Sequence, residues 1–139
     1  AIVIDGTPID LTKVDTPVYI QGGKEDHIAP ARSSYKLTQH FAGPVRFVLA
    51  GSGHIAGVVN PPDAKKYQHW TNDTLPARFE DFAATATEHP GSWWPDWITW
   101  LTAQSGKEVP ARTPGKGAKG ATLKVIEDAP GRYVRERVG

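Results

Sequence analysis

The chain has 139 residues, of which 39% are hydrophobic and 22% are charged, a composition typical of a globular domain rather than a disordered segment. Its net charge of +1 does not support nucleic-acid binding through bulk charge. It contains no cysteine, which excludes disulfides, thiolate metal sites and a thiol nucleophile within this chain. It also lacks methionine, so we expect an internal or terminal piece of a longer protein.

Charge is unevenly distributed along the chain. Residues 107–139 hold eight Lys or Arg and four Asp or Glu, a net charge of +4, which leaves −3 for residues 1–106. Residues 107–120 are rich in Pro, Gly and Lys, which predicts a linker followed by a basic tail. No apolar stretch approaches the roughly 18 residues of a membrane span, and the first residues do not resemble a signal peptide.

The first half of the chain predicts two strong strands joined by a helix. Residues 14–21 contain Val, Tyr and Ile, which favour strands, and end at a pair of glycines. Residues 31–41 place apolar side chains on a roughly helical period after Pro30, a residue that suits the first helical turn. Residues 45–50 form an apolar run bounded by turn residues, typical of a buried strand. Before these elements, residues 1–11 predict a strand, a turn and a short extended segment.

The short helical crossover between the two strong strands favours a parallel pair with a right-handed connection. Asp26 follows the first of these strands, and His54 follows the second on a glycine-rich turn. Because the carboxyl ends of parallel strands meet at one edge, we expect Asp26 and His54 to be neighbours in space. Open α/β sheets place their chemistry at that edge.

The second half of the chain predicts helices and loops. We expect a loop over residues 61–75 and a helix over residues 76–88. Ser92 is a plausible N-cap for a helix over residues 93–104, in which four tryptophans recur at helical spacing. Residues 123–126 predict a short strand.

Asp26 and His54 come in the order in which the acid and the histidine of an α/β-hydrolase triad occur. In such a triad the acid orients the imidazole, and the histidine takes a proton from the nucleophile. Two plainer interpretations stay open: Asp26 as an acid stabilised at a helix N-terminus, and His54 as a structural histidine. The sequence has neither G-x-S-x-G nor its cysteine version, and Ser52 lies only two residues from His54. The chain therefore holds at most two members of a triad.

The histidines, the tryptophans and several basic residues are also considered as binding groups. The histidines considered as metal ligands show no H-x-x-x-H spacing, so we expect no metal site: His27, His54, His69 and His89. The tryptophan-rich helix is either a core helix or an apolar surface for a partner or a water-insoluble product. Basic residues near the sheet edge either meet a phosphate-bearing substrate or form solvated surface: Arg32, Lys65 and Lys66.

Four strings resemble the C-terminal part of the catalytic domain of polyhydroxyalkanoate synthases, especially the class I type: PVYIQGGKEDHIAP, FVLAGSGHIAGVVNPP, HWTND and GSWWPDWITWL. The resemblance runs from about Val14 to Gln104, and APGRYV, Ala129 to Val134, also resembles the end of those enzymes. It implies an α/β fold that is a partial α/β-hydrolase fold, with the last parallel strands and helices present and the nucleophile half missing. Residues 1–106 would be the C-terminal portion of that catalytic domain.

The resemblance also implies a function. Members of this family polymerise (R)-3-hydroxyacyl-CoA into polyester and release CoA through a Cys-His-Asp triad, of which Asp26 would be the acid and His54 the histidine. It implies no resident cofactor, because CoA is the leaving group of the substrate. The expected partners are the hydroxyacyl-CoA, the growing polyester chain, the polyester granule surface and a second copy in a homodimer, all in the cytoplasm, with no nucleic acid and no membrane span.

Two alternatives to a polymerase remain. One is a fragment of an α/β-hydrolase esterase or polyester depolymerase, which would need a serine elbow outside this chain. The other is a non-enzymatic granule-binding module that uses the tryptophan-rich helix. In the polymerase interpretation, the isolated chain would expose apolar sheet faces and one unpaired edge, so we expect it to be poorly stable and inactive.

Overall fold

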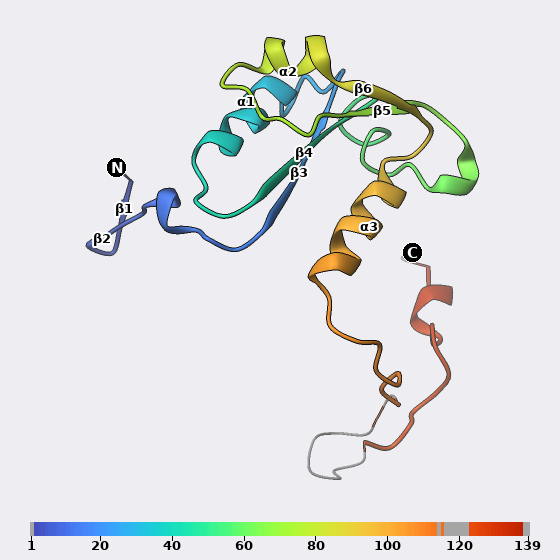
Figure 1. Ribbon diagram of the computed structural model, residues 1–139. Helices are drawn as coiled ribbons and strands as arrows, with labels where there is room; N and C mark the ends of the chain where they lie inside the picture. The colour runs from blue at the N-terminus through green and yellow to red at the C-terminus, as the bar shows by residue number, and fades with distance from the viewer. Residues whose placement is uncertain (1, 114, 116–122, 138–139) are drawn as a thin grey trace. The chain divides into compact units, whose positions relative to one another are not determined.

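The computed structural model describes residues 2–113, 115 and 123–137. The chain divides into two units, Ala1–Ser105 and Gly106–Gly139, and each is described by itself. The first unit is a mixed α/β structure whose elements are labelled in Figure 1. Both residues of the predicted acid–histidine pair lie in turns of this unit, after strands of its sheet.

The centre of the first unit is a four-stranded sheet in the order β3-β4-β5-β6. Strands β3, Val18–Gly23, and β4, Val45–Ala50, are parallel and pair from Val18 opposite Val45 to Gly23 opposite Ala50. Strands β5, Gln68–Thr71, and β6, Thr87–Pro90, continue the sheet in antiparallel fashion. The predicted parallel pair is therefore confirmed.

The antiparallel half of the sheet was not predicted. The stretch expected as a loop contains a 3₁₀ turn, Pro62–Ala64, and strand β5. The helix expected over residues 76–88 is shorter, because α2 spans Phe79–Thr85 and the chain then extends into β6. A strand of four residues shows too little alternation of apolar and polar side chains to be recognised from its sequence. The backbone N–H and C=O groups of such a strand are satisfied by pairing with neighbouring strands of the sheet.

The helix within the crossover from β3 to β4 is also shorter than predicted. Helix α1 spans Ala31–Tyr35 and passes into a 3₁₀ turn, Lys36–Gln39. Near the N-terminus, strands β1, Val3–Ile4, and β2, Thr7–Pro8, form a two-stranded antiparallel hairpin. Of the short extended segment expected over residues 9–11, Asp10 has an extended backbone, and a 3₁₀ turn, Leu11–Lys13, begins directly after it.

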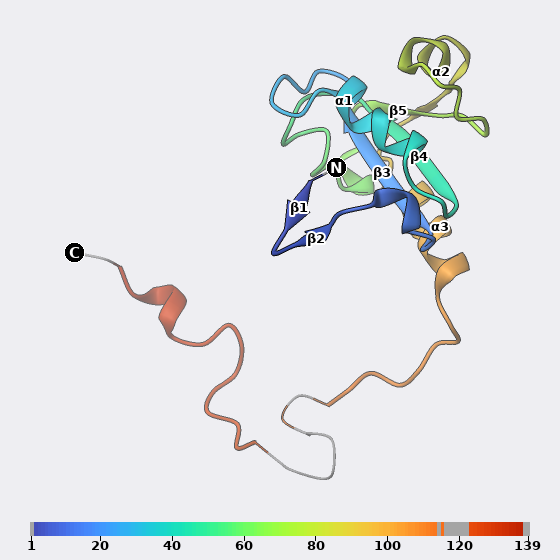
Figure 2. The ribbon, with the colours of Figure 1, turned by 90° about the vertical axis from the view of Figure 1, so that its left-hand side faces the viewer.

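Helices cover both faces of the sheet (Figures 1 and 2). Helices α1 and α2 pack on one face, and α3, Trp94–Gln104, packs on the other. The alternation of side chains along β4 decides this division, because Phe47 and Leu49 face α1 and α2, whereas Val48 faces α3. The larger buried cluster comprises Ile20, Ala31, Tyr35, Phe47, Leu49 and Phe82.

The second unit has little regular structure among its described residues, which include a 3₁₀ turn at Tyr133–Arg135. The strand predicted over residues 123–126 is wrong: this segment is irregular, and the apolar side chains of Leu123, Val125 and Ile126 are exposed. The linker predicted over residues 107–120 lies partly outside the described residues. In the part of the chain that the structure describes, no helix has the length and apolar character needed to cross a membrane.

Candidate active site

The turns that follow β3 and β4 are joined at one edge of the sheet. Gly23 and Ala50, the last residues of the two strands, lie opposite each other in the ladder. Beyond them, the backbone N–H of Lys24 donates to the Ala50 carbonyl at 2.8 Å, and that of Glu25 donates to the Ser52 carbonyl at 3.1 Å. These hydrogen bonds extend the pairing past the strands and bring the two turns side by side.

Asp26 and His54 form a hydrogen-bonded pair at this edge. The His54 Nδ1 atom lies 2.8 Å from Asp26 Oδ2. The other carboxylate oxygen, Oδ1, accepts the backbone N–H groups of Ile28 at 2.9 Å and Ala29 at 2.8 Å. The Asp26 side chain is 7% exposed, whereas that of His54 is 46% exposed. The expectation that these distant residues are spatial neighbours is thus confirmed.

Electrostatics keep the Asp26 carboxyl charged. The backbone N–H of Ala29 lowers the pKa of Asp26 most, and the hydrogen bond with His54 lowers it further, against the opposing effect of desolvation. A charged carboxylate only accepts hydrogen bonds, so His54 must place a proton on Nδ1. In the neutral ring, Nε2 then carries a lone pair that can take a proton.

The His54 turn has a tight backbone. Ser52 adopts a left-handed conformation with φ of 74°. The N–H of Gly57 donates to the Gly53 carbonyl at 2.9 Å. A Cβ atom at Gly57 would lie 2.7 Å from the Gly53 carbonyl oxygen and 2.9 Å from that of Gly51, so only glycine fits there.

The remaining histidines considered as ligands do not gather into a metal site. The described residues contain no group of three or more His, Cys, Asp or Glu side chains placed to bind a metal ion. His69 and His89 do face each other across β5 and β6, with ring centroids 5.1 Å apart. His69 Nδ1 lies 3.2 Å from the Gly91 carbonyl oxygen, and His89 Nε2 lies 2.8 Å from Thr71 Oγ1. Burial is the main reason that the pKa of His69 is lowered.

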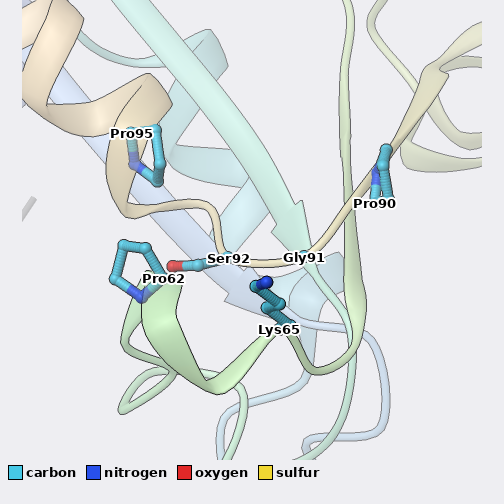
Figure 3. A pocket seen from close by; sticks show the side chains of 6 residues that line it. All are labelled: Pro62, Lys65, Pro90, Gly91, Ser92 and Pro95. Carbon is cyan, nitrogen blue, oxygen red and sulfur yellow. The ribbon is translucent and has the colours of Figure 1, made fainter.

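The basic residues considered for phosphate binding are dispersed. Arg32 on α1 forms an ion pair with Glu80 on α2 at 2.7 Å. Lys65 borders a hollow of about 310 Å³ between the 3₁₀ turn and the start of α3, shown in Figure 3. Its wall consists of Pro62, Lys65, Pro90, Gly91, Ser92 and Pro95. Neither Asp26 nor His54 lines this hollow.

The tryptophan-rich segment packs on the sheet at its start and exposes apolar side chains farther along, and no residue within α3 itself is fully buried. Trp93 is buried and packs with Val48 and Ala50 beneath α3. Farther along the helix, Trp97, Ile98 and Leu101 expose apolar surface. The helix starts one residue later than predicted, so its N-cap residue is Trp93 and the N-cap predicted at Ser92 is wrong. The Ser92 hydroxyl still accepts the backbone N–H of Trp94 at 3.0 Å.

Sequence reasoning missed a charged network that joins α3 to the sheet. Asp96 accepts a hydrogen bond from the Tyr19 hydroxyl at 2.7 Å and a bidentate pair from Arg46, whose Nε lies 2.8 Å away. Burial alone would raise the pKa of Asp96, but the bonds from Arg46 and Tyr19 outweigh it and lower that pKa. The sequence contains one indication that Asp96 faces the sheet. Asp96 lies three residues after Trp93 and four before Trp100, on the same helical face as these apolar side chains.

Comparison with known proteins gives a consistent result. No family model matches the chain. Over 136 residues, or 98% of its length, it is 48% identical to poly(3-hydroxyalkanoate) polymerase subunit PhaC of Rhizobium etli and 47% identical to that of Cupriavidus necator. It is 52% identical over 135 residues, or 96% of its length, to poly(3-hydroxyalkanoate) polymerase of Methylorubrum extorquens.

The chain covers 21%, 23% and 22% of these three relatives, respectively, so it spans about a fifth of their length. The matched region covers 96–98% of the chain, so it includes the strands and turns that carry Asp26 and His54. The chain therefore corresponds to a fragment of a poly(3-hydroxyalkanoate) polymerase of the PhaC type.

Proposed function

We propose that this chain supplies the acid and the base of a Cys-His-Asp triad in a class I polyhydroxyalkanoate synthase, whose cysteine lies outside the chain. The observation that carries this proposal is the 2.8 Å hydrogen bond between His54 Nδ1 and Asp26 Oδ2 at the carboxyl ends of two parallel strands. The relatives are named as polymerases, which favours a polymerase over an esterase or depolymerase.

The proposed reaction starts with transfer of the cysteine proton to His54 Nε2. The thiolate attacks the carbonyl carbon of a hydroxyacyl-CoA, the bond to the CoA sulfur breaks, and the imidazolium returns its proton to the leaving CoA thiolate. The hydroxyl of a second unit then gives its proton to His54 and attacks the carbonyl carbon of the enzyme thioester. An ester bond forms, the bond to the cysteine sulfur breaks, and the imidazolium returns the proton to that sulfur. Asp26 holds the imidazole tautomer and stabilises its charged form in each proton transfer. This series of reaction steps uses no resident cofactor.

The unpaired edge of β3 supports the proposed partial α/β-hydrolase fold. β3 is the outer strand of the four-stranded sheet, and its outer edge pairs with no other strand among the described residues. The Nε2 atom of Gln21, also on β3, is buried without a hydrogen-bond partner among the described residues. Unsatisfied buried groups are rare in complete domains. We infer that the rest of the polymerase completes the sheet and its surroundings next to β3.

The partners follow from the same proposal. Hydroxyacyl-CoA and the polyester chain would reach His54 at the sheet edge, where its ring is exposed. The apolar surface of Trp97, Ile98 and Leu101 suits a contact with the polyester granule in the cytoplasm or with a second copy of the synthase in a dimer.

The triad assignment is tested with His54→Ala in a full-length polymerase that carries this segment. We expect release of CoA from (R)-3-hydroxybutyryl-CoA to fall by at least about 10²-fold, the usual contribution of a positioned general base. His40→Ala is the matched control, because His40 is exposed beyond the 3₁₀ turn of the crossover. Turnover by His54→Ala at the rate of the unmodified enzyme would refute the assignment.

A further inference from the structure

Helix α3 is hydrogen-bonded to the turn that carries His54. The indole N–H of Trp93 donates to the carbonyl oxygen of Gly57 at 2.9 Å, within the interior. The N–H of Gly57 donates in turn to the carbonyl of Gly53, the residue directly before His54. Two consecutive hydrogen bonds thus lead from the helix to the backbone of the proposed base.

Trp94 makes a second connection to the same turn. Its indole N–H donates to the Val58 carbonyl at 3.0 Å. Adjacent tryptophans therefore bind the carbonyl groups of two consecutive peptides, Gly57–Val58 and Val58–Val59. A turn held at two consecutive carbonyls cannot rotate either peptide without losing one of the bonds.

The Trp93 indole is itself held firmly. Its side chain lies against Val48 and Ala50 of β4 and is 9% exposed as a residue. Its ring is nearly parallel to that of Tyr19, with centroids 6.0 Å apart. Tyr19 also donates a hydrogen bond to Asp96, and Arg46 of β4 binds the same carboxylate. These contacts hold the indole of Trp93 in place against the sheet.

The His54 turn has little packing of its own. His54 and Ile55 are both exposed, so side-chain burial contributes little to fixing this part of the backbone. Its conformation rests instead on hydrogen bonds, including those from the turn after β3 and those from α3. A displacement of about 1 Å at a catalytic group can reduce a rate by roughly 10²-fold.

We propose that Trp93 is a positioning residue, whose indole N–H fixes the turn over residues 53–57 and thereby holds His54 against Asp26. Trp94 reinforces it through Val58. This inference rests on the proposed function of His54, but it assigns the tryptophans a task beyond filling the core. The indole N–H of Trp93 bonds to the Gly57 carbonyl of the turn, so Trp93 acts on the reaction only through His54.

The test uses Trp93→Phe in a full-length polymerase that carries this segment. Phenylalanine keeps an aromatic ring but removes the N–H donor, so we expect kcat for CoA release to fall roughly 5- to 100-fold, with KM changed less than about threefold. Trp100→Phe is the matched control, because Trp100 also packs on Tyr19, at 5.4 Å, and no hydrogen bond from its indole appears among the described residues. The control should stay within about twofold of the unmodified enzyme.

A double-mutant cycle separates positioning from a structural role. In an Asp26→Asn background His54 already carries its proton on Nε2 and cannot act as the base, so adding Trp93→Phe should reduce the residual rate by less than about twofold. Replacement of Trp93 with 3-benzothienylalanine, which keeps the shape of indole without the donor, should reproduce the loss if Trp93→Phe folds poorly by circular dichroism.

The outcomes are distinguishable. A fully active His54→Ala enzyme would refute the proposed function and this inference with it. If His54→Ala is inactive but Trp93→Phe matches Trp100→Phe, the positioning role alone is overturned. A full additional loss from Trp93→Phe in the Asp26→Asn background would likewise overturn it, because the effect would then not pass through the Asp26–His54 pair.

Discussion

Replacing Asp26 with asparagine in a full-length polymerase is the sharpest test of the acid–histidine pair. The asparagine side chain has the same shape, and its carbonyl oxygen can still accept the N–H groups of Ile28 and Ala29, as Asp26 Oδ1 does now. The amide nitrogen then takes the position of Oδ2, 2.8 Å from His54 Nδ1. Two N–H groups cannot face each other at that distance, so His54 must switch its proton to Nε2.

This switch removes the base without disturbing the fold. With its proton on Nε2, the ring has no lone pair toward the nucleophile, and a triad histidine held in the wrong tautomer costs about 10⁴-fold in kcat. That loss corresponds to about 5 kcal/mol of transition-state stabilisation. Because the two backbone hydrogen bonds survive, we expect the melting temperature to change little.

The assay is CoA release from (R)-3-hydroxybutyryl-CoA, followed with a thiol reagent, with circular dichroism as the check on folding. Asp63→Asn is the matched control, because Asp63 is an exposed carboxylate on the 3₁₀ turn that follows the His54 turn. A kcat for Asp26→Asn within tenfold of the unmodified enzyme would show that Asp26 does not set the tautomer of His54.

The pKa of Asp26 in the folded protein lies below its ordinary value of 3.8. The charged Asp26 carboxylate therefore contributes to the stability of the fold at pH values above 3.8, and this contribution is lost as the pH falls through the lowered pKa.

Two further predictions concern stability. Asp96→Asn should lower the free energy of unfolding of the full-length enzyme by about 2 kcal/mol, because the guanidinium of Arg46 loses its charged partner at a largely buried site; an apparent melting temperature equal to that of the unmodified enzyme would contradict this. The isolated 139-residue chain should aggregate in size-exclusion chromatography and release no CoA, because the outer edge of β3 has no partner strand in the part of the chain that the structure describes, and the chain has no thiol. CoA release by the purified chain alone would contradict the assignment.

Much of the candidate site was predictable from local patterns. The strands around Val18–Gly23 and Val45–Ala50 are apolar runs that end at glycines, and the short helical segment between them favours parallel pairing. Parallel pairing alone brings the two following turns to one edge. Asp26 and His54 could therefore be recognised as a pair without any knowledge of side-chain positions.

The antiparallel strands could not be predicted in the same way. Strands β5 and β6 have four residues each, and their pairing partners are chosen by the sheet rather than by local propensity. The segment Phe79–Thr85 forms a helix, but its end depends on the return of the chain to the sheet at Thr87. The stacked pair of His69 and His89 exists only because of this register.

The sequence by itself determined the chemistry that the chain can offer: a carboxylate and an imidazole at one sheet edge, and no thiol. The tertiary structure alone decided how that imidazole is held. Trp93 and Gly57 are 36 residues apart, and their hydrogen bond arises from the packing of α3 on the face of the sheet that carries Tyr19. Contacts between elements depend on how their faces fit together, which no local pattern of residues specifies.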